Sequence, residues 1–149
     1  MDKTVTLVFA TITERAAMLS AFEAKQAVNT NGESMFSDVR IYSKDNEAIK
    51  TYIIEGAKLL EARLASSFTI DSTTGENGIT WTFTDLDTRR TELKADKFQE
   101  ALVCYILTRW LENKIPNTAQ AYNAMFKDLS EAAVKITKTK RKPQRPQES

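Results

Sequence analysis

The sequence has no histidine and, among its 149 residues, only four glycines, three prolines and one cysteine. Without histidine, the Ser-His-Asp and Cys-His catalytic arrangements and most zinc sites are excluded. The four glycines form neither GxGxxG nor GxxxxGK followed by Ser or Thr, so neither standard phosphate-binding loop is present. One cysteine cannot form an intrachain disulfide. These absences argue against the common classes of catalytic and cofactor-binding site.

Long hydrophobic runs are also missing. No run reaches the roughly 18–20 apolar residues that a membrane-spanning helix needs, and no apolar signal segment follows the opening Met-Asp-Lys. We therefore expect no membrane association, and either a cytosolic product or one that is assembled inside a cell. The single cysteine, Cys104, lies in the apolar run 101–107, which favours a buried thiol over a nucleophile.

Paired carboxylates are the remaining route to acid–base chemistry. Asp85 with Asp87, and Asp45 with Glu47, are the candidate pairs. Both pairs stand where polar loops and helix starts usually place acids, and neither has a visible partner group. We therefore expect no enzyme activity, with no catalytic residue, no metal and no cofactor.

Charge is unevenly distributed along the chain. The net charge is +1, but residues 138–149 contain five basic residues and one acid, Glu148, which gives +4 and leaves about −3 for the rest. This segment also has two prolines and no apolar anchor, so we expect an extended basic tail. The length fits one domain, which we place at residues 1–137, with the tail at 138–149.

Three segments predict helices. Residues 45–64 carry one apolar stripe, and Ser43 or Asp45 can cap this helix. Gly56 lies within the stripe. It indicates either a tolerated loss of stability or the close approach of a neighbouring helix. Residues 93–113 are apolar nearly all round between 101 and 107, which predicts a central helix. Pro116 suits the start of a final helix reaching about residue 136, and the short link predicts an antiparallel pair.

The clearest strand signal lies between the first two of these helices. Residues 79–84 alternate apolar residues with threonines, and a turn-like segment, 72–78, separates them from a shorter strand at 68–71. This pattern predicts a β-hairpin. A lone hairpin is marginal in water, so its apolar face, formed by Ile79, Trp81 and Phe83, either covers this protein's own helices or meets another subunit.

The N-terminal third is ambiguous. Residues 3–12 are β-branched and apolar and fit a short strand, while Thr11 followed by Glu14 resembles a capping box for a helix over 14–28. Strand-then-helix and helix-from-the-start both remain open. Residues 29–37 predict a loop. Together these elements predict a mainly α fold: a small bundle of about three to four helices with a projecting β-hairpin and an extended basic C-terminal arm.

Two further groups have alternative interpretations. Tyr105, Arg109, Trp110 and Tyr122 have the composition of a ligand-pocket lining, but helical spacing favours core packing. The basic tail is a solvated segment, a docking arm for an acidic partner, or a contact to nucleic acid. No aromatic residue follows Phe126, so sequence-specific recognition of nucleic acid is not expected.

The order of helix, hairpin, long apolar helix, proline turn, helix and basic tail resembles the small head–tail connector (adaptor) proteins of tailed bacteriophages. The resemblance covers about residues 45–145. It rests on the helix 49–64, the hairpin around 79–83, Tyr105 and Trp110, then Pro116, Tyr122 and the closing basic segment 140–145.

The resemblance implies a structural virion protein without enzymatic activity, which is assembled in the host cytoplasm. It would dock on the portal protein as a ring of its own copies, commonly twelve, prolong the DNA channel and meet other neck or tail proteins. Ile79, Trp81 and Phe83 would then lie at a subunit contact. The docking arm would comprise Lys138, Lys140, Arg141, Lys142, Pro143 and Arg145.

Two other function classes remain open. A small nucleic-acid-associated protein acting through its basic tail would bind DNA in a salt-dependent way, and removal of residues 138–149 would abolish that binding. An enzyme that works with carboxylates alone would hold two acids with perturbed pKa values in a concave site.

Overall fold

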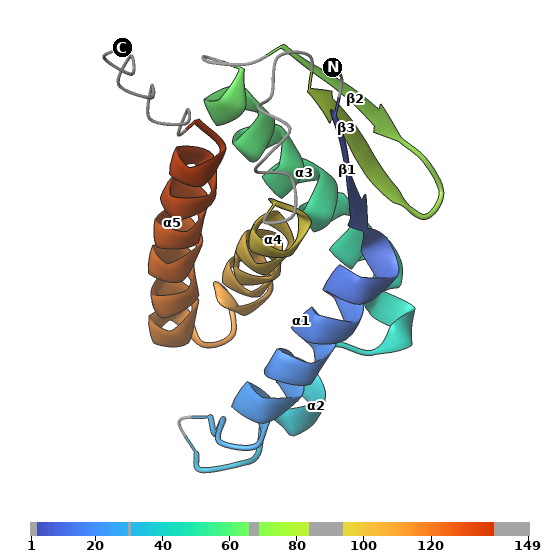
Figure 1. Ribbon diagram of the computed structural model, residues 1–149. Coiled ribbons are helices and arrows are strands. Elements are labelled where there is room, and N and C mark those ends of the chain that lie inside the picture. Colours follow the sequence, from blue (N-terminus) through green and yellow to red (C-terminus); the bar gives the residue numbers. More distant parts are fainter. Residues whose placement is uncertain (1–2, 30, 66–68, 84–93, 139–149) are drawn as a thin grey trace, which may run out of the picture.

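The computed structural model describes residues 3–29, 31–65, 69–83 and 94–138 (Figure 1). Over these residues the chain is mainly helical, with a small three-stranded antiparallel sheet. The long helices are α1 (Phe9–Ala24), α3 (Asn46–Leu64), α4 (Lys94–Leu111) and α5 (Pro116–Lys138). A short helix α2 (Phe36–Val39) and a 3₁₀ turn η1 (Ser43–Asp45) connect α1 to α3. The predicted mainly α fold class is confirmed.

The sheet consists of β1 (Lys3–Val8), β2 (Ile70–Thr74) and β3 (Gly78–Phe83), in the order β1-β3-β2. The predicted hairpin is the β2–β3 pair. β1 adds a third strand on the other side of β3, with Val5 opposite Trp81 and Leu7 opposite Ile79. The two strands run so close at Gly78 that a Cβ there would collide with the backbone oxygen of Leu7, which excludes any larger residue.

At the N-terminus the structure has a strand followed by a helix. α1 begins at Phe9, directly after β1, and its N-cap Val8 makes no side-chain capping bond. The expected capping box at Thr11 and Glu14 is therefore wrong, because these residues already lie inside the helix. The backbone N–H of Val8 instead donates to Gln99 Oε1 of α4, so a side chain from a distant helix satisfies the end of the strand.

The bounds of α3, α4 and α5 follow the predictions closely, whereas β2 runs through Thr74 into the predicted turn 72–78, and α1 ends at Ala24 rather than at residue 28. The predicted loop ends two residues early, because Phe36 and Ser37 begin α2. Asp45 precedes α3 without capping it, since its carboxylate accepts the backbone N–H of Tyr42. α4 and α5 pack along each other as the predicted antiparallel pair (Figure 1).

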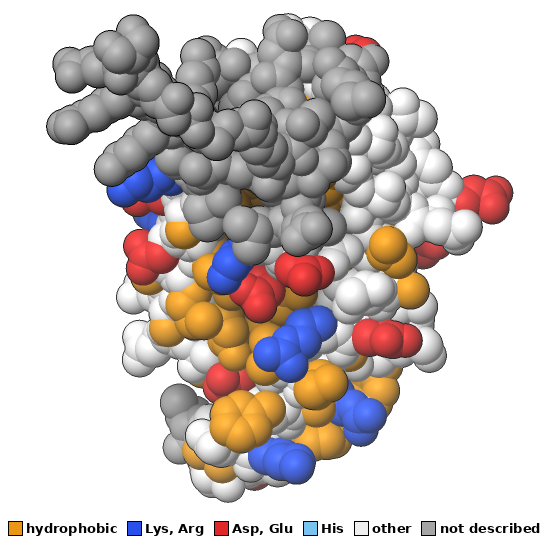
Figure 2. Space-filling view, in the orientation of Figure 1, with side chains coloured by type: hydrophobic (Ala, Val, Ile, Leu, Met, Phe, Trp, Pro, Cys, Tyr) orange, Lys and Arg blue, Asp and Glu red, His pale blue; other side chains and the backbone are white. Residues whose placement is uncertain are grey.

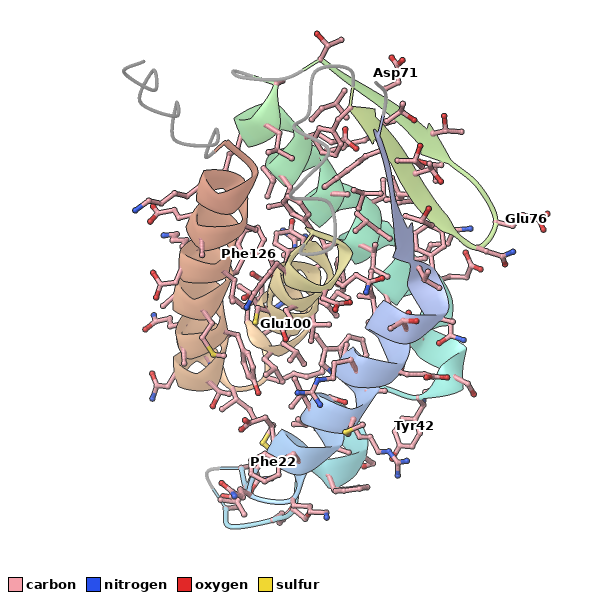
Figure 3. The ribbon with its side chains drawn as sticks, viewed as in Figure 1. Phe22, Tyr42, Asp71, Glu76, Glu100 and Phe126 are labelled. Atoms are coloured by element: carbon pink, nitrogen blue, oxygen red, sulfur yellow. The ribbon has the colours of Figure 1, made fainter. Side chains whose placement is uncertain are left out.

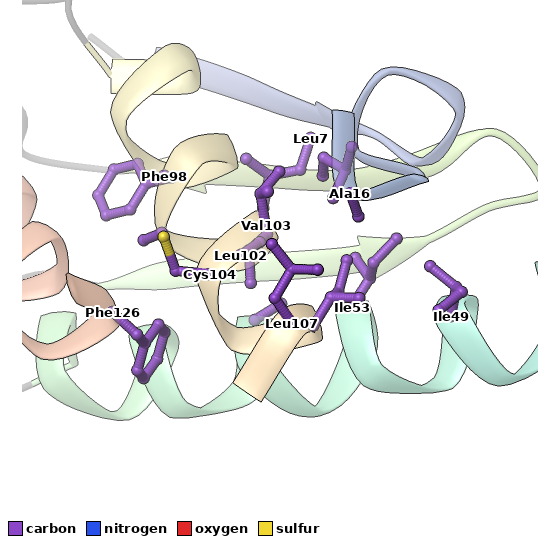
Figure 4. Close-up of a cluster of buried hydrophobic side chains, with 14 of the residues drawn as sticks. Leu7, Ala16, Ile49, Ile53, Phe98, Leu102, Val103, Cys104, Leu107 and Phe126 are labelled. Atoms are coloured by element: carbon purple, nitrogen blue, oxygen red, sulfur yellow. The ribbon is translucent and has the colours of Figure 1, made fainter. Parts of the chain in front are cut away.

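One continuous core joins the sheet to the helices (Figure 4). α4 lies at its centre and contacts α1, α3, α5 and β1. α3 crosses α4 at Gly56, where a Cβ would lie 2.8 Å from Leu102 Cδ2 and 2.9 Å from Tyr105 Cδ1. The close-approach interpretation of Gly56 therefore holds, and a larger residue would overpack this crossing.

Candidate functional site

The apolar face of the hairpin lies inside the chain's own core. Ile79 is 1% exposed, and Trp81 and Phe83 are fully buried. The ring of Trp81 makes edge contacts with Phe83 at 6.3 Å and with Phe98 of α4 at 5.1 Å between centroids. The structure therefore supports the interpretation in which this face covers the protein's own helices. The expected subunit contact through these three side chains is corrected, because no surface of theirs is left for a partner.

The polar edge of Trp81 is also satisfied within the chain. Its Nε1–H donates to Glu61 Oε1 of α3 at 2.7 Å, and the same oxygen accepts the hydroxyl of Ser72 at 2.7 Å. Glu61 thus joins α3 to both strands of the hairpin. A charge-assisted bond of this kind is stronger than one between neutral groups, so Glu61 fixes the sheet on the helix.

The docking arm lies almost wholly outside the described residues. Lys138 is the last residue of α5, and its side chain is not described. Lys140, Arg141, Lys142, Pro143 and Arg145 follow it, outside the described part of the chain. The arm therefore stays a prediction from sequence.

The aromatic group on α4 and α5 packs against other elements of the protein. Tyr105 donates to Glu55 at 3.1 Å, Tyr122 donates to Glu23 at 3.0 Å, and Trp110 Nε1 donates to the Val39 carbonyl at 2.6 Å. Burial, reinforced by the bonded carboxylate, raises the pKa of both tyrosines. These bonds tie α3, α1 and α2 to the α4–α5 pair, which agrees with the core-packing interpretation.

Arg109 belongs to the same surface. Its Nε lies 3.9 Å from a carboxylate oxygen of Glu55, and its guanidinium carbon lies 5.5 Å from the ring centroid of Tyr52. Both Arg109 and Glu55 are substantially exposed, so this pair contributes little to stability. On the surface formed by α3 and α4, the positive charge of Arg109 thus lies between the negative charges of Glu55 and Glu112.

The cysteine and the candidate acids do not come together in one site among the described residues. Cys104 is buried on α4, and burial raises the pKa of its thiol to about 11, so the reactive thiolate is suppressed at neutral pH. Of the candidate acids, Asp45 bonds Tyr42 and Glu47 lines a cleft, whereas Asp85 and Asp87 lie outside the described residues. Among the described residues, no three metal-ligating side chains come together.

An open cleft of about 650 Å³ lies where β1, α1, η1 and α3 meet the tip of the hairpin. Glu14, Glu47 and Glu76 line it from three different elements, together with Tyr42. The ammonium of Lys50, which also lines the cleft, lies 5.3 Å from the ring centroid of Phe9. The cleft is therefore acidic with partly aromatic walls, a surface suited to a positively charged segment.

The structure also exposes apolar residues that the sequence interpretation did not single out. Met18 and Phe22 on α1 are 61% and 58% exposed, and Val28 just beyond the helix is 62% exposed. A second hollow of about 560 Å³ lies beside Met18 and Phe22 and continues from the first cleft through Glu14 and Ala17. Figure 2 shows hydrophobic and basic side chains lying next to each other over the lower part of this face. The i, i+4 spacing of Met18 and Phe22 was the available signal.

Comparisons with protein-family models, curated proteins and solved structures found no match to this chain. In the part of the chain that the structure describes, no helix is both long enough and apolar enough to cross a membrane.

Proposed function

We propose that this chain is a head–tail connector (adaptor) of a tailed bacteriophage, a structural virion protein without enzymatic activity. In this role it docks as a ring on the portal protein, extends the DNA channel and meets other neck or tail proteins. The ring is assembled in the host cytoplasm before it becomes part of the virion.

The observation that carries the proposal is the order of the elements. α3, the β2–β3 hairpin, α4, the turn at Pro116 and α5 follow one another in the described residues. This is the order on which the resemblance to connector proteins rests. The basic segment 138–149 then begins at Lys138, the last residue of α5.

Surface character gives further support. An assembly protein needs contact surfaces rather than a deep site, and apolar patches that stay exposed on a small domain typically mark such contacts. The exposed apolar residues of α1 and the acidic cleft beside them are surfaces of this kind. The basic arm would engage an acidic surface of the portal through charge attraction.

The test is affinity purification of the tagged full chain from cells that produce its native neighbours, followed by negative-stain electron microscopy. We expect rings of this chain stacked on a larger ring. A matched variant in which Lys140, Arg141, Lys142 and Arg145 are replaced by glutamine should fold equally well and capture the larger ring poorly. A monomer of 16.8 kDa that co-purifies with no ring would contradict the proposal.

A second candidate function rests on the charge of residues 138–149 alone, which hold five basic residues and one acid. In that case the chain is a small nucleic-acid-associated protein. The purified full chain would then bind DNA with an affinity that falls steeply with salt, and the glutamine variant would lose this binding. The connector proposal expects little affinity of the free chain for DNA.

A further inference from the structure

α1 carries two stripes on opposite faces. The inner stripe is buried and consists of Phe9, Ile12, Ala16, Ser20 and Ala24. The outer stripe consists of Ala17, Met18, Ala21 and Phe22, and ends at Lys25. Most helices at a protein surface are polar opposite their buried face. This outer stripe is instead apolar, and its two large side chains are more than half exposed.

α5 repeats this arrangement. Its inner stripe is buried and consists of Ala119, Tyr122, Phe126, Ser130 and Ala133. The outer stripe consists of Ala121, Ala124 and Met125, and ends at Asp128; Met125 is 48% exposed. Alanines beside one large side chain let a second helix approach closely, since the distance between helix axes depends on the side chains at the contact.

The two outer stripes match each other in spacing and differ in charge. Met18, Ala21, Phe22 and Lys25 have the same separations as Ala121, Ala124, Met125 and Asp128. The α1 stripe is bordered by three basic groups and one acid: Arg15, Lys25, Arg40 and Glu14. Two acids, Asp128 and Glu131, border the α5 stripe, and the exposed Lys127 lies beside Asp128 on the same helix. At the matching ends of the two stripes, Lys25 and Asp128 therefore carry opposite charges.

We propose that the α1 stripe of one copy packs in parallel against the α5 stripe of a second copy, with Phe22 beside Met125 and Lys25 beside Asp128. A thioether next to an aromatic ring is a favourable contact. Both helices pack against α4 within one copy (Figures 1 and 3), yet each turns its outer stripe away from the core.

Such a contact joins two different surfaces and is therefore heterologous. Repetition of a heterologous contact produces a closed ring when the rotation closes, and a filament when it does not. The inference rests on the proposed ring assembly and deepens it, because it names the subunit surfaces. It also replaces the contact through the hairpin, whose apolar face is buried.

The test is the mass of the full-length chain at increasing concentration, measured by sedimentation velocity for the native chain and for Lys25→Glu, Asp128→Lys and the double variant. We expect the native chain to associate. Each single variant should weaken association about tenfold, because like charges then face each other, and the double variant should restore it. Lys58→Glu on the exposed side of α3 is the control and should associate like the native chain. Circular dichroism should show equal folding for all variants.

A second measurement fixes the register. Mild oxidation of the Ala21→Cys, Ala124→Cys chain should give a ladder of covalent oligomers, while Cys104 stays buried and unreacted. Three results would each overturn the inference. The native chain could stay monomeric, the single variants could associate as the native chain does, or the double variant could fail to recover self-association.

The outcome can be separated from that of the proposed function. If Lys25→Glu still forms rings on the portal, the subunit contact lies elsewhere and the connector function stands. If the charge exchange restores self-association but no ring forms with the native neighbours, this interface stands and the connector function fails.

Discussion

At the scale of single residues, Cys104 shows how burial controls chemistry. Its side chain belongs to the buried core and lies on the side of α4 that faces Phe98 and Phe126 in Figure 4. Desolvation is the main cause of its raised pKa, and the negative charge of Glu100 adds to it. A thiol in these surroundings behaves as a small apolar side chain.

This shift makes stability depend on alkaline pH. The pKa of Cys104 is about 11 in the folded chain against 9.0 for the unperturbed group, so the folded state retains a proton that the unfolded state loses. The free energy of unfolding should therefore be constant below about pH 9 and fall as the pH rises to 11. Urea unfolding of the native chain and of Cys104→Ala across this range measures the effect. An equal fall in the variant would assign it to other groups, such as Tyr122, whose pKa is also raised.

At the scale of elements, the attachment of the sheet to the helices depends on a few contacts. Trp81 fills the space between β3 and α4, and Glu61 of α3 accepts the indole N–H and the Ser72 hydroxyl. Trp81 of β3 thus provides both the packing and a hydrogen bond that attach the sheet to the helices. Loss of the ring would leave a cavity and also remove a donor from Glu61.

We expect Trp81→Ala to lower the free energy of unfolding by about 3–5 kcal/mol. Trp81→Phe keeps most of the packing and should cost less, since it loses mainly the bond to Glu61. Ser72→Ala, on the exposed strand β2, should cost no more than about 1 kcal/mol. Urea titrations followed by circular dichroism compare the three. A small loss for Trp81→Ala would show that the hairpin is not part of the folding core.

At the scale of the whole molecule, a single core predicts cooperative unfolding. The buried cluster is continuous from β1 to α5. The two tryptophans report on separate parts of it: Trp81 on the sheet, and Trp110 on the contact with Val39, the last residue of α2. In Trp81→Phe and in Trp110→Phe, the remaining tryptophan's fluorescence and the far-UV circular dichroism should give the same midpoint. Separate transitions would mean that sheet and helices unfold independently.

Much of the fold was predictable from local patterns. The stripes of α3 and α5, the apolar run of α4 and the alternation of β3 each repeat with the period of their element, so a short window is enough to recognise them. β1 was ambiguous because residues 3–12 mix a strand pattern with a helix start. Its pairing with β3 joins residues about 75 positions apart, and no local signal carries that information.

The candidate site was less predictable, because it depends on which faces meet. The alternation of Ile79, Trp81 and Phe83 showed that one face of the strand must be covered, and only tertiary packing showed that α3 and α4 cover it. Phe22 shows the opposite outcome. Its sequence neighbourhood is that of an ordinary apolar helix residue, and only the tertiary structure shows that its side chain is 58% exposed. The sequence by itself thus determined the elements, the absence of histidine chemistry and the basic tail, since these follow from composition and period. The tertiary structure alone decided which apolar faces are buried and which remain for a partner, because burial depends on contacts between residues far apart in the chain.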